Sequence, residues 1–153
     1  MAGVRLSHPA PHRSAPRLST LDRTLPASII NENTEMVTKR YHWIFDAEGI
    51  STERVTDEDL LRRMLHGVAE ICEMKIVGGP MVIQGVPENP GLTAFCIVDF
   101  SHISIHTFSV HNEICIDVFS CKPFAPEKIR RYLTDIFQAD AARVTFFEVQ
   151  YPE

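Results

Sequence analysis

The sequence lacks a basic excess and a long apolar run, and each absence narrows what the protein can be. Its 153 residues carry 15 Lys and Arg against 20 Asp and Glu, a net charge of −5. Proteins that bind nucleic acid usually present a basic surface, so nucleic acid is not expected as a partner. Charged residues or histidines interrupt every hydrophobic run before it reaches the roughly 18 residues that a membrane-spanning helix requires. We therefore expect a soluble protein with no membrane partner.

A paired-cysteine motif is also lacking. The four cysteines form no CxxC pair, and each lies in or beside an apolar segment: Cys72, Cys96, Cys115 and Cys121. Reduced, buried thiols are typical of proteins in a reducing compartment. The cysteines therefore predict an intracellular, cytoplasmic protein.

The chain divides by charge near Arg40. Residues 1–40 carry six Lys and Arg against three Asp and Glu, whereas residues 41–153 carry nine against 17. Four prolines stand among Ser and Arg in the first part without a sustained hydrophobic period, which is typical of segments that cannot bury enough apolar surface to fold. The remainder is long enough and apolar enough for one domain. We predict a disordered extension over residues 1–36 and one folded domain over residues 37–153.

Hydrophobic periodicity predicts a small α+β domain. A capping box of Thr56 and Asp59 begins an apolar stripe at helical spacing, and Pro126 begins a second one. Alternating or continuous apolar runs predict six or seven strands, at residues 37–46, 75–77, 81–84, 92–98, 101–108, 114–119 and 143–149. Two amphipathic helices can cover one face of such a sheet. The expected fold is a two-layer sandwich, a mostly antiparallel β-sheet covered on one face by two helices.

Chemically active residues gather in two neighbouring strands, residues 101–108 and 116–121, which carry two histidines, several hydroxyls and a cysteine. His102 and His106 could form a metal pair, although no third ligand is evident. Cys121 near a histidine could be a nucleophile. A strand with one polar face and a buried cysteine explains the same pattern without chemistry. The residue pattern alone leaves these readings open.

The run Ser101-His-Ile-Ser-Ile-His106-Thr, with Asp117-Val-Phe-Ser-Cys121 downstream, resembles the bacterial and archaeal S-adenosylmethionine decarboxylases. Their motif reads approximately E-S-H-x-S-I-H-T-W-P-E, followed by D-V-F-T-C. The spacing from Ser101 to Cys121 matches without a gap, and a weaker similarity extends over residues 41–149. The resemblance implies a lyase of polyamine biosynthesis that is made as a zymogen and processes itself.

In that family the serine hydroxyl attacks the preceding carbonyl. The resemblance therefore implies that Ser101 attacks the carbonyl of Phe100, that the chain is cut between residues 100 and 101, and that a pyruvoyl cofactor forms from Ser101. The pyruvoyl ketone would form a Schiff base with the amine of a small amino-acid-type substrate and act as the electron sink for loss of CO₂. By position, His106 assists elimination during processing, Cys121 protonates the product carbon, and Thr93 replaces a serine that assists processing. The resemblance also implies a homodimer with active sites at the subunit interface.

Three positions of the substrate pocket depart from the family pattern. Val110 replaces a glutamate that holds the ribose hydroxyls, Pro87 replaces a phenylalanine that stacks on adenine, and Phe100 replaces a glutamate before the processed serine. Valine cannot accept those hydrogen bonds. These changes favour a basic amino acid, ornithine or arginine, as substrate.

Two alternatives stay open: a true S-adenosylmethionine decarboxylase that supplies the aminopropyl donor for spermidine, and a non-catalytic paralogue that acts as a regulatory subunit. A basic substrate would need an acid for its distal cation. The candidates by location are Asp46, Asp99, Glu113 and Asp117. The aromatic run of residues 41–43 could line the pocket or belong to the core.

Overall fold

The computed structural model describes residues 39–151, and these form one sheet with helices packed against it. The sheet has six strands in the order β2-β3-β4-β5-β1-β6, and every neighbouring pair is antiparallel. Its strands are β1 (Tyr41–Glu48), β2 (Ile76–Val86), β3 (Asn89–Val98), β4 (Ser101–Phe108), β5 (Glu113–Ser120) and β6 (Val144–Glu148). The extension predicted over residues 1–36 lies outside the described residues and stays a prediction.

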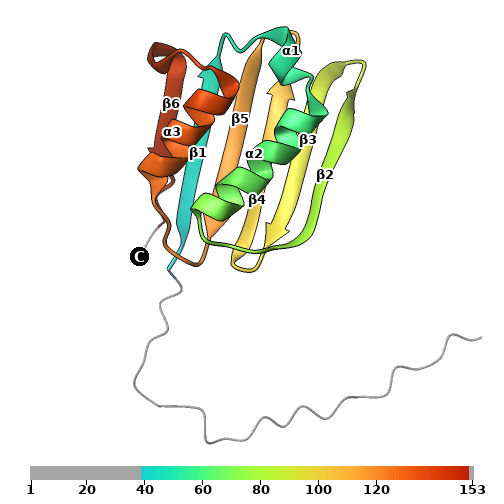
Figure 1. Ribbon diagram of the computed structural model, residues 1–153. Coiled ribbons are helices and arrows are strands. Elements are labelled where there is room, and N and C mark those ends of the chain that lie inside the picture. Colours follow the sequence, from blue (N-terminus) through green and yellow to red (C-terminus); the bar gives the residue numbers. More distant parts are fainter. Residues whose placement is uncertain (1–38, 152–153) are drawn as a thin grey trace, which may run out of the picture. The chain divides into compact units, whose positions relative to one another are not determined.

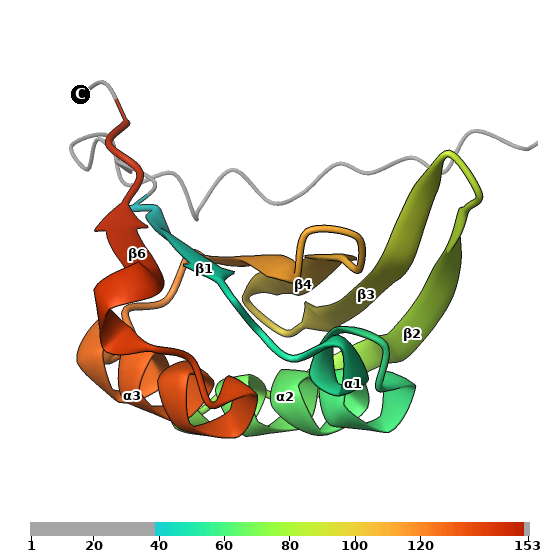
Figure 2. The same cartoon turned by 90° about the horizontal axis from the view of Figure 1, so that it is seen from above.

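The helices all lie on one side of the sheet (Figures 1 and 2). They are α1 (Thr52–Val55), α2 (Glu58–Ile71) and α3 (Pro126–Phe137). The core lies between the layers, where α2 buries Leu61, Met64 and Leu65 and α3 buries Ile129 and Leu133. The predicted α+β sandwich is confirmed. Among residues 39–151, no helix is long and apolar enough to cross a membrane.

The start of α2 differs from the expectation. The side chain of Asp57 accepts a hydrogen bond from Leu60 N at 2.8 Å and is therefore the N-cap. The Thr56 hydroxyl instead donates to Thr52 O at 2.8 Å, because α1 forms a separate short turn just before it. The predicted capping box at Thr56 is wrong by one residue.

The two short strands predicted at residues 75–77 and 81–84 are one strand. β2 continues through Gly78-Gly79-Pro80, where its register with β3 shifts twice. These shifts are β-bulges, which let a strand absorb extra residues without ending. The sheet therefore has six strands, the lower of the two expected numbers.

Alternation along β4 and β5 divides their side chains between the two faces of the sheet. Ile103, Ile105 and Thr107 are buried on the helix-facing side, whereas His102 and His106 lie on the opposite side, hereafter the open face. None of the helices within residues 39–151 covers the open face (Figure 2). Several large apolar side chains of the other strands are exposed on this face by the same alternation: Val77, Met81, Ile83, Ile97 and Phe147.

Candidate active site

Ser101 begins β4 directly after a tight turn from β3. The turn is held by Asp99, whose carboxylate accepts a hydrogen bond from Lys75 N at 3.1 Å. Ser101 has a φ of 148°, a region that residues with a Cβ rarely adopt and that costs about 1–3 kcal/mol. The backbone is therefore strained at the bond that the resemblance assigns to self-cleavage.

The carbonyl of Phe100 is polarised by a neighbouring strand end. Cys121 N donates a hydrogen bond to Phe100 O at 3.1 Å, because Cys121 follows β5 where Ser120 pairs with Ser101. A backbone N–H in this position can stabilise negative charge that develops on the carbonyl oxygen during attack. The structure thus brings Phe100, Ser101 and Cys121 together.

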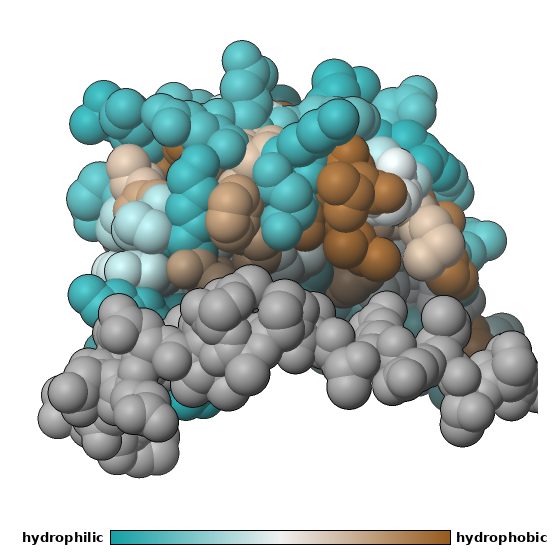
Figure 3. Space-filling model, turned by 90° about the horizontal axis from the view of Figure 1, so that it is seen from below, coloured by the Kyte–Doolittle hydropathy of each residue, from teal (hydrophilic) through white to brown (hydrophobic). Residues whose placement is uncertain are grey.

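The side chain of Phe100 lies at the surface of the described part of the chain. It is 44% exposed, and Lys122 Nζ lies 5.5 Å from the ring centroid. In Figure 3, which looks onto this end of the sheet, hydrophobic side chains reach the surface among hydrophilic ones. The expected role of Phe100 in substrate binding stays a prediction.

Thr93 and His106 form a second group on the open face. They are register partners on β3 and β4, and Thr93 Oγ1 lies 2.7 Å from His106 Nδ1. Five residues along one strand separate Ser101 from His106, which is about 16 Å at about 3.3 Å per residue. In one chain the predicted catalytic residues are therefore divided into two groups, Ser101 with Cys121 and Thr93 with His106.

The two histidines cannot share a metal. His102 and His106 are four residues apart on a strand, which separates them by about 13 Å. Among residues 39–151, no three His, Cys, Asp or Glu side chains gather closely enough to hold a metal ion.

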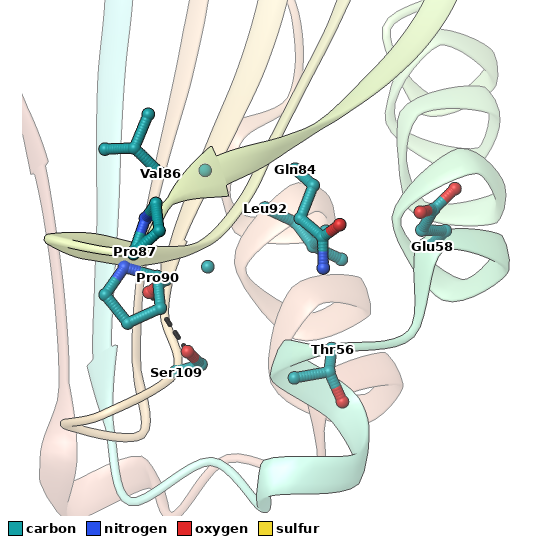
Figure 4. A pocket seen from close by; sticks show the side chains of 10 residues that line it. Thr56, Glu58, Gln84, Val86, Pro87, Pro90, Leu92 and Ser109 are labelled. Carbon is teal, nitrogen blue, oxygen red and sulfur yellow. Dashed lines mark hydrogen bonds between the residues drawn. The ribbon is translucent and has the colours of Figure 1, made fainter.

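The two remaining substrate-pocket positions lie where the β2–β3 hairpin meets the β4–β5 turn. Val110 is 68% exposed and lines a hollow of about 170 Å³ with Phe108. Pro87 lies at the hairpin tip and lines a separate hollow of about 390 Å³, which extends toward Glu58 at the start of α2 (Figure 4). The two positions therefore lie in the same region and line two different hollows.

Of the candidate acids, Asp46 and Glu113 line a common hollow. This hollow of about 460 Å³ also includes Glu48 and Cys115, and neither Lys nor Arg lines it. Asp99 lies in the turn between β3 and β4, where its carboxylate accepts the hydrogen bond from Lys75 N. The three carboxylates of Asp46, Glu48 and Glu113 around one hollow offer a place for a cation. We call this hollow the acidic hollow.

Asp117, the fourth candidate, belongs to a network that the sequence analysis missed. Its Oδ2 accepts a hydrogen bond from His42 Nε2, and His42 Nδ1 lies 2.7 Å from the hydroxyl of Tyr151. Its Oδ1 lies 3.4 Å from His102 Nε2. These four residues, His42, His102, Asp117 and Tyr151, come from four different parts of the chain, so no local motif could have indicated the network.

The thiols differ in reactivity. Burial raises the pKa of Cys72 to about 12 and that of Cys96 to about 11. Burial and a hydrogen bond with Asp46 raise the pKa of Cys115 to about 12. These three stay protonated near neutral pH, and thiolates rather than thiols are nucleophiles. Cys121 is exposed and is the accessible thiol of the group.

Comparison with known proteins identifies the family. Residues 41–149 match the model of the family described as S-adenosylmethionine decarboxylase. The S-adenosylmethionine decarboxylase proenzyme of Pyrococcus furiosus is 30% identical over 117 residues, which cover 72% of this chain and 78% of that protein. The Archaeoglobus fulgidus proenzyme is 27% identical, with 61% of this chain and 94% of that protein covered.

The crystal structure of the adenosylmethionine decarboxylase from Aquifex aeolicus has the same fold. It superposes with a TM-score of 0.59 at 23% identity, and the match covers 73% of this chain and 89% of that one. The chain belongs to the S-adenosylmethionine decarboxylase family. It is a pyruvoyl-dependent carboxy-lyase, made as a proenzyme that generates its pyruvoyl group from an internal serine by self-cleavage. The predicted family, enzyme class and cofactor are confirmed.

The residues around Ser101 fit this cofactor. Its strained backbone and the hydrogen bond on the preceding carbonyl both favour attack by the hydroxyl. No other serine among residues 39–151 has a positive φ. The roles of Thr93, His106 and Cys121 remain predictions.

Replacing the accessible thiol tests the role predicted for Cys121. We expect Cys121→Ala to be cleaved like the wild type, because its backbone N–H is retained, but to release CO₂ about 100-fold more slowly, the size of a typical general-acid contribution. Mass spectrometry measures cleavage and a CO₂ assay measures turnover. Cys96→Ala, which removes a thiol from the helix-facing side, is the control. An unchanged rate in Cys121→Ala would remove the proposed role.

Proposed function

We propose that this enzyme decarboxylates a basic amino acid, ornithine or arginine, with a pyruvoyl group made from Ser101, and thereby serves polyamine biosynthesis. The observation that carries the proposal is Val110. The resemblance places the ribose-binding carboxylate at this position, and a valine side chain has no atom that accepts a hydrogen bond. A site without this acceptor loses a principal means of recognising the nucleoside part of S-adenosylmethionine.

The acidic hollow supports a cationic substrate. His106 and Asp46 both pair with Cys115, from opposite sides, so they lie two strands apart on the open face. Two strand spacings separate the two backbone positions by about 10 Å. An extended ornithine or arginine covers part of this distance between its α-carbon and its distal cation, and the side chains of His106 and Asp46 shorten the rest. A substrate whose α-carbon lies beside His106 can therefore place its distal cation near Asp46.

The division of the site supports a homodimer. Ser101 and Cys121 lie too far from Thr93 and His106 of the same chain to act with them. A second copy that covers the open face would bring the two groups together in an isologous interface. The exposed apolar side chains of that face, such as Met81 and Ile83, give such an interface its hydrophobic area.

In this arrangement each residue has one task. The pyruvoyl group supplies the ketone that accepts electrons when CO₂ leaves. Cys121 delivers a proton to the product carbon, the Thr93–His106 pair moves the proton required for elimination during processing, and the acidic hollow orients the substrate.

A second candidate is S-adenosylmethionine itself, which family membership favours. The deciding experiment measures CO₂ release by the purified enzyme from ornithine, arginine and S-adenosylmethionine at equal concentrations. Our proposal requires the highest kcat/KM for one of the two basic amino acids. A higher kcat/KM for S-adenosylmethionine would establish the second candidate, and no CO₂ release from any of them by an uncut chain would favour a regulatory subunit.

Val110→Glu tests directly whether the residue at position 110 selects the substrate. It restores a hydrogen-bond acceptor, so the kcat/KM for S-adenosylmethionine should rise about tenfold relative to that for the basic amino acid. Val110→Leu, which stays apolar, is the matched control and should leave the ratio unchanged. If the ratio in Val110→Glu equals that of the control, position 110 does not select the substrate.

A further inference from the structure

The hydroxyl of Ser101 has an acceptor within its own chain. His102 Nδ1 lies 3.1 Å from Ser101 Oγ, which is hydrogen-bond distance. The ring of His102 is held by aromatic neighbours: it stacks on Phe95 at a centroid distance of 5.5 Å and lies 5.6 Å from the ring of Phe119. The imidazole is therefore packed in place beside the hydroxyl.

Asp117 determines which nitrogen of His102 can accept a proton. Among residues 39–151, Asp117 Oδ1 is a buried side-chain oxygen without a hydrogen-bond partner, and His102 Nε2 lies 3.4 Å from it. A carboxylate only accepts hydrogen bonds, so it favours the tautomer with the proton on Nε2. This leaves Nδ1 free to accept the proton of Ser101.

His42 and Tyr151 hold the carboxylate itself. His42 Nε2 donates to Asp117 Oδ2, and the hydroxyl of Tyr151 lies 2.7 Å from His42 Nδ1. With one oxygen occupied by His42, only Oδ1 remains for His102. Serine, histidine and aspartate thus lie in the order that activates a serine hydroxyl in enzymes of unrelated fold.

We propose that His102 is the base that starts self-cleavage, and that Asp117 is its positioning residue. His102 Nδ1 takes the proton from Ser101 Oγ as the oxygen forms a bond to the carbonyl carbon of Phe100. The carbonyl electron pair moves onto the oxygen, where Cys121 N–H stabilises it. When the carbon–nitrogen bond breaks, His102 returns the proton to the Ser101 nitrogen, which leaves an ester and a free amine.

This inference rests on the proposed cleavage between Phe100 and Ser101, and it assigns the two steps of processing to different histidines. Loss of His102 blocks ester formation, whereas loss of His106, the residue predicted to assist elimination, leaves the ester formed but uneliminated. Hydroxylamine cleaves esters much faster than amides. It therefore distinguishes a chain that has formed the ester from a chain that has not.

The experiment synthesises the full chain in a cell-free system and follows cleavage with time by mass spectrometry, with and without hydroxylamine. In His102→Asn, cleavage should slow about 100-fold and hydroxylamine should not restore it. In His106→Gln, hydroxylamine should cut the chain at Ser101. Asp117→Asn should slow the first step without accumulating ester, and Asp117→Glu should recover part of the rate.

Circular dichroism checks that each variant folds. A second variant at position 102 checks that a loss of cleavage comes from the missing base. His102→Gly leaves space for a small base, so added imidazole should raise its rate of cleavage. Wild-type cleavage in His102→Asn, or rapid cutting of that variant by hydroxylamine, would overturn the assignment of His102. An uncut wild-type chain would instead overturn the proposed cleavage on which the inference rests.

Discussion

Ser101→Ala is expected to remain a single chain and to release no detectable CO₂ from any substrate. Without the hydroxyl there is no nucleophile to attack the carbonyl of Phe100, and without cleavage there is no pyruvoyl group. Alanine keeps the Cβ of serine, so the backbone strain at φ 148° is unchanged and the fold should be retained. Denaturing mass spectrometry and the CO₂ assay measure the two effects.

The matched control is Ser51→Ala. Ser51 precedes α1 and its side chain makes no capping hydrogen bond, so its hydroxyl has no structural partner there. This variant should be cleaved and active like the wild type. A cleaved and active Ser101→Ala protein would exclude Ser101 as the precursor of the cofactor.

Mixing two inactive variants is expected to restore cleavage if the site is shared between two copies. In a dimer of Ser101→Ala with His106→Gln, one site is intact: it takes Ser101 from the second variant and His106 from the first. We expect the His106→Gln chain to be cut in the co-expressed mixture and to stay mostly uncut when expressed alone. Distinct affinity tags on the two chains allow their fragments to be told apart.

The opposite site of that mixed dimer has neither residue, so the Ser101→Ala chain must stay intact and serves as the internal control. If the His106→Gln chain is cut no faster in the mixture than alone, while the tags show that mixed dimers form, the two residues do not act across an interface. The proposed homodimeric site would then be wrong.

Most of the fold was predictable because its elements follow simple periods. α2 and α3 place apolar residues at helical spacing, and β4 and β5 alternate along their whole length. The capping box was misplaced by one residue because of the local turn α1, whereas the error in β2 occurred where a tertiary contact overrides local pattern. β2 passes through Gly78-Gly79-Pro80 because pairing with β3 tolerates bulges there.

The site was predictable only in part. The spacing of Ser101, His106 and Cys121 indicated the family, and an alternating strand already implies that Ser101 and His106 lie far apart. The contact between Cys121 N and Phe100 O depends on the β4–β5 register. The pairing of His42 with Asp117 joins residues 75 positions apart, and single-sequence periodicity carries no information about such a contact.

The most direct test of the account is denaturing mass spectrometry of the purified wild-type protein, with N-terminal sequencing of its fragments. We expect two polypeptides, residues 1–100 and 101–153, the second with no free amine because residue 101 carries the pyruvoyl group. A single intact chain, or a fragment that begins at another residue, would contradict the assignment of Ser101 as the source of the cofactor.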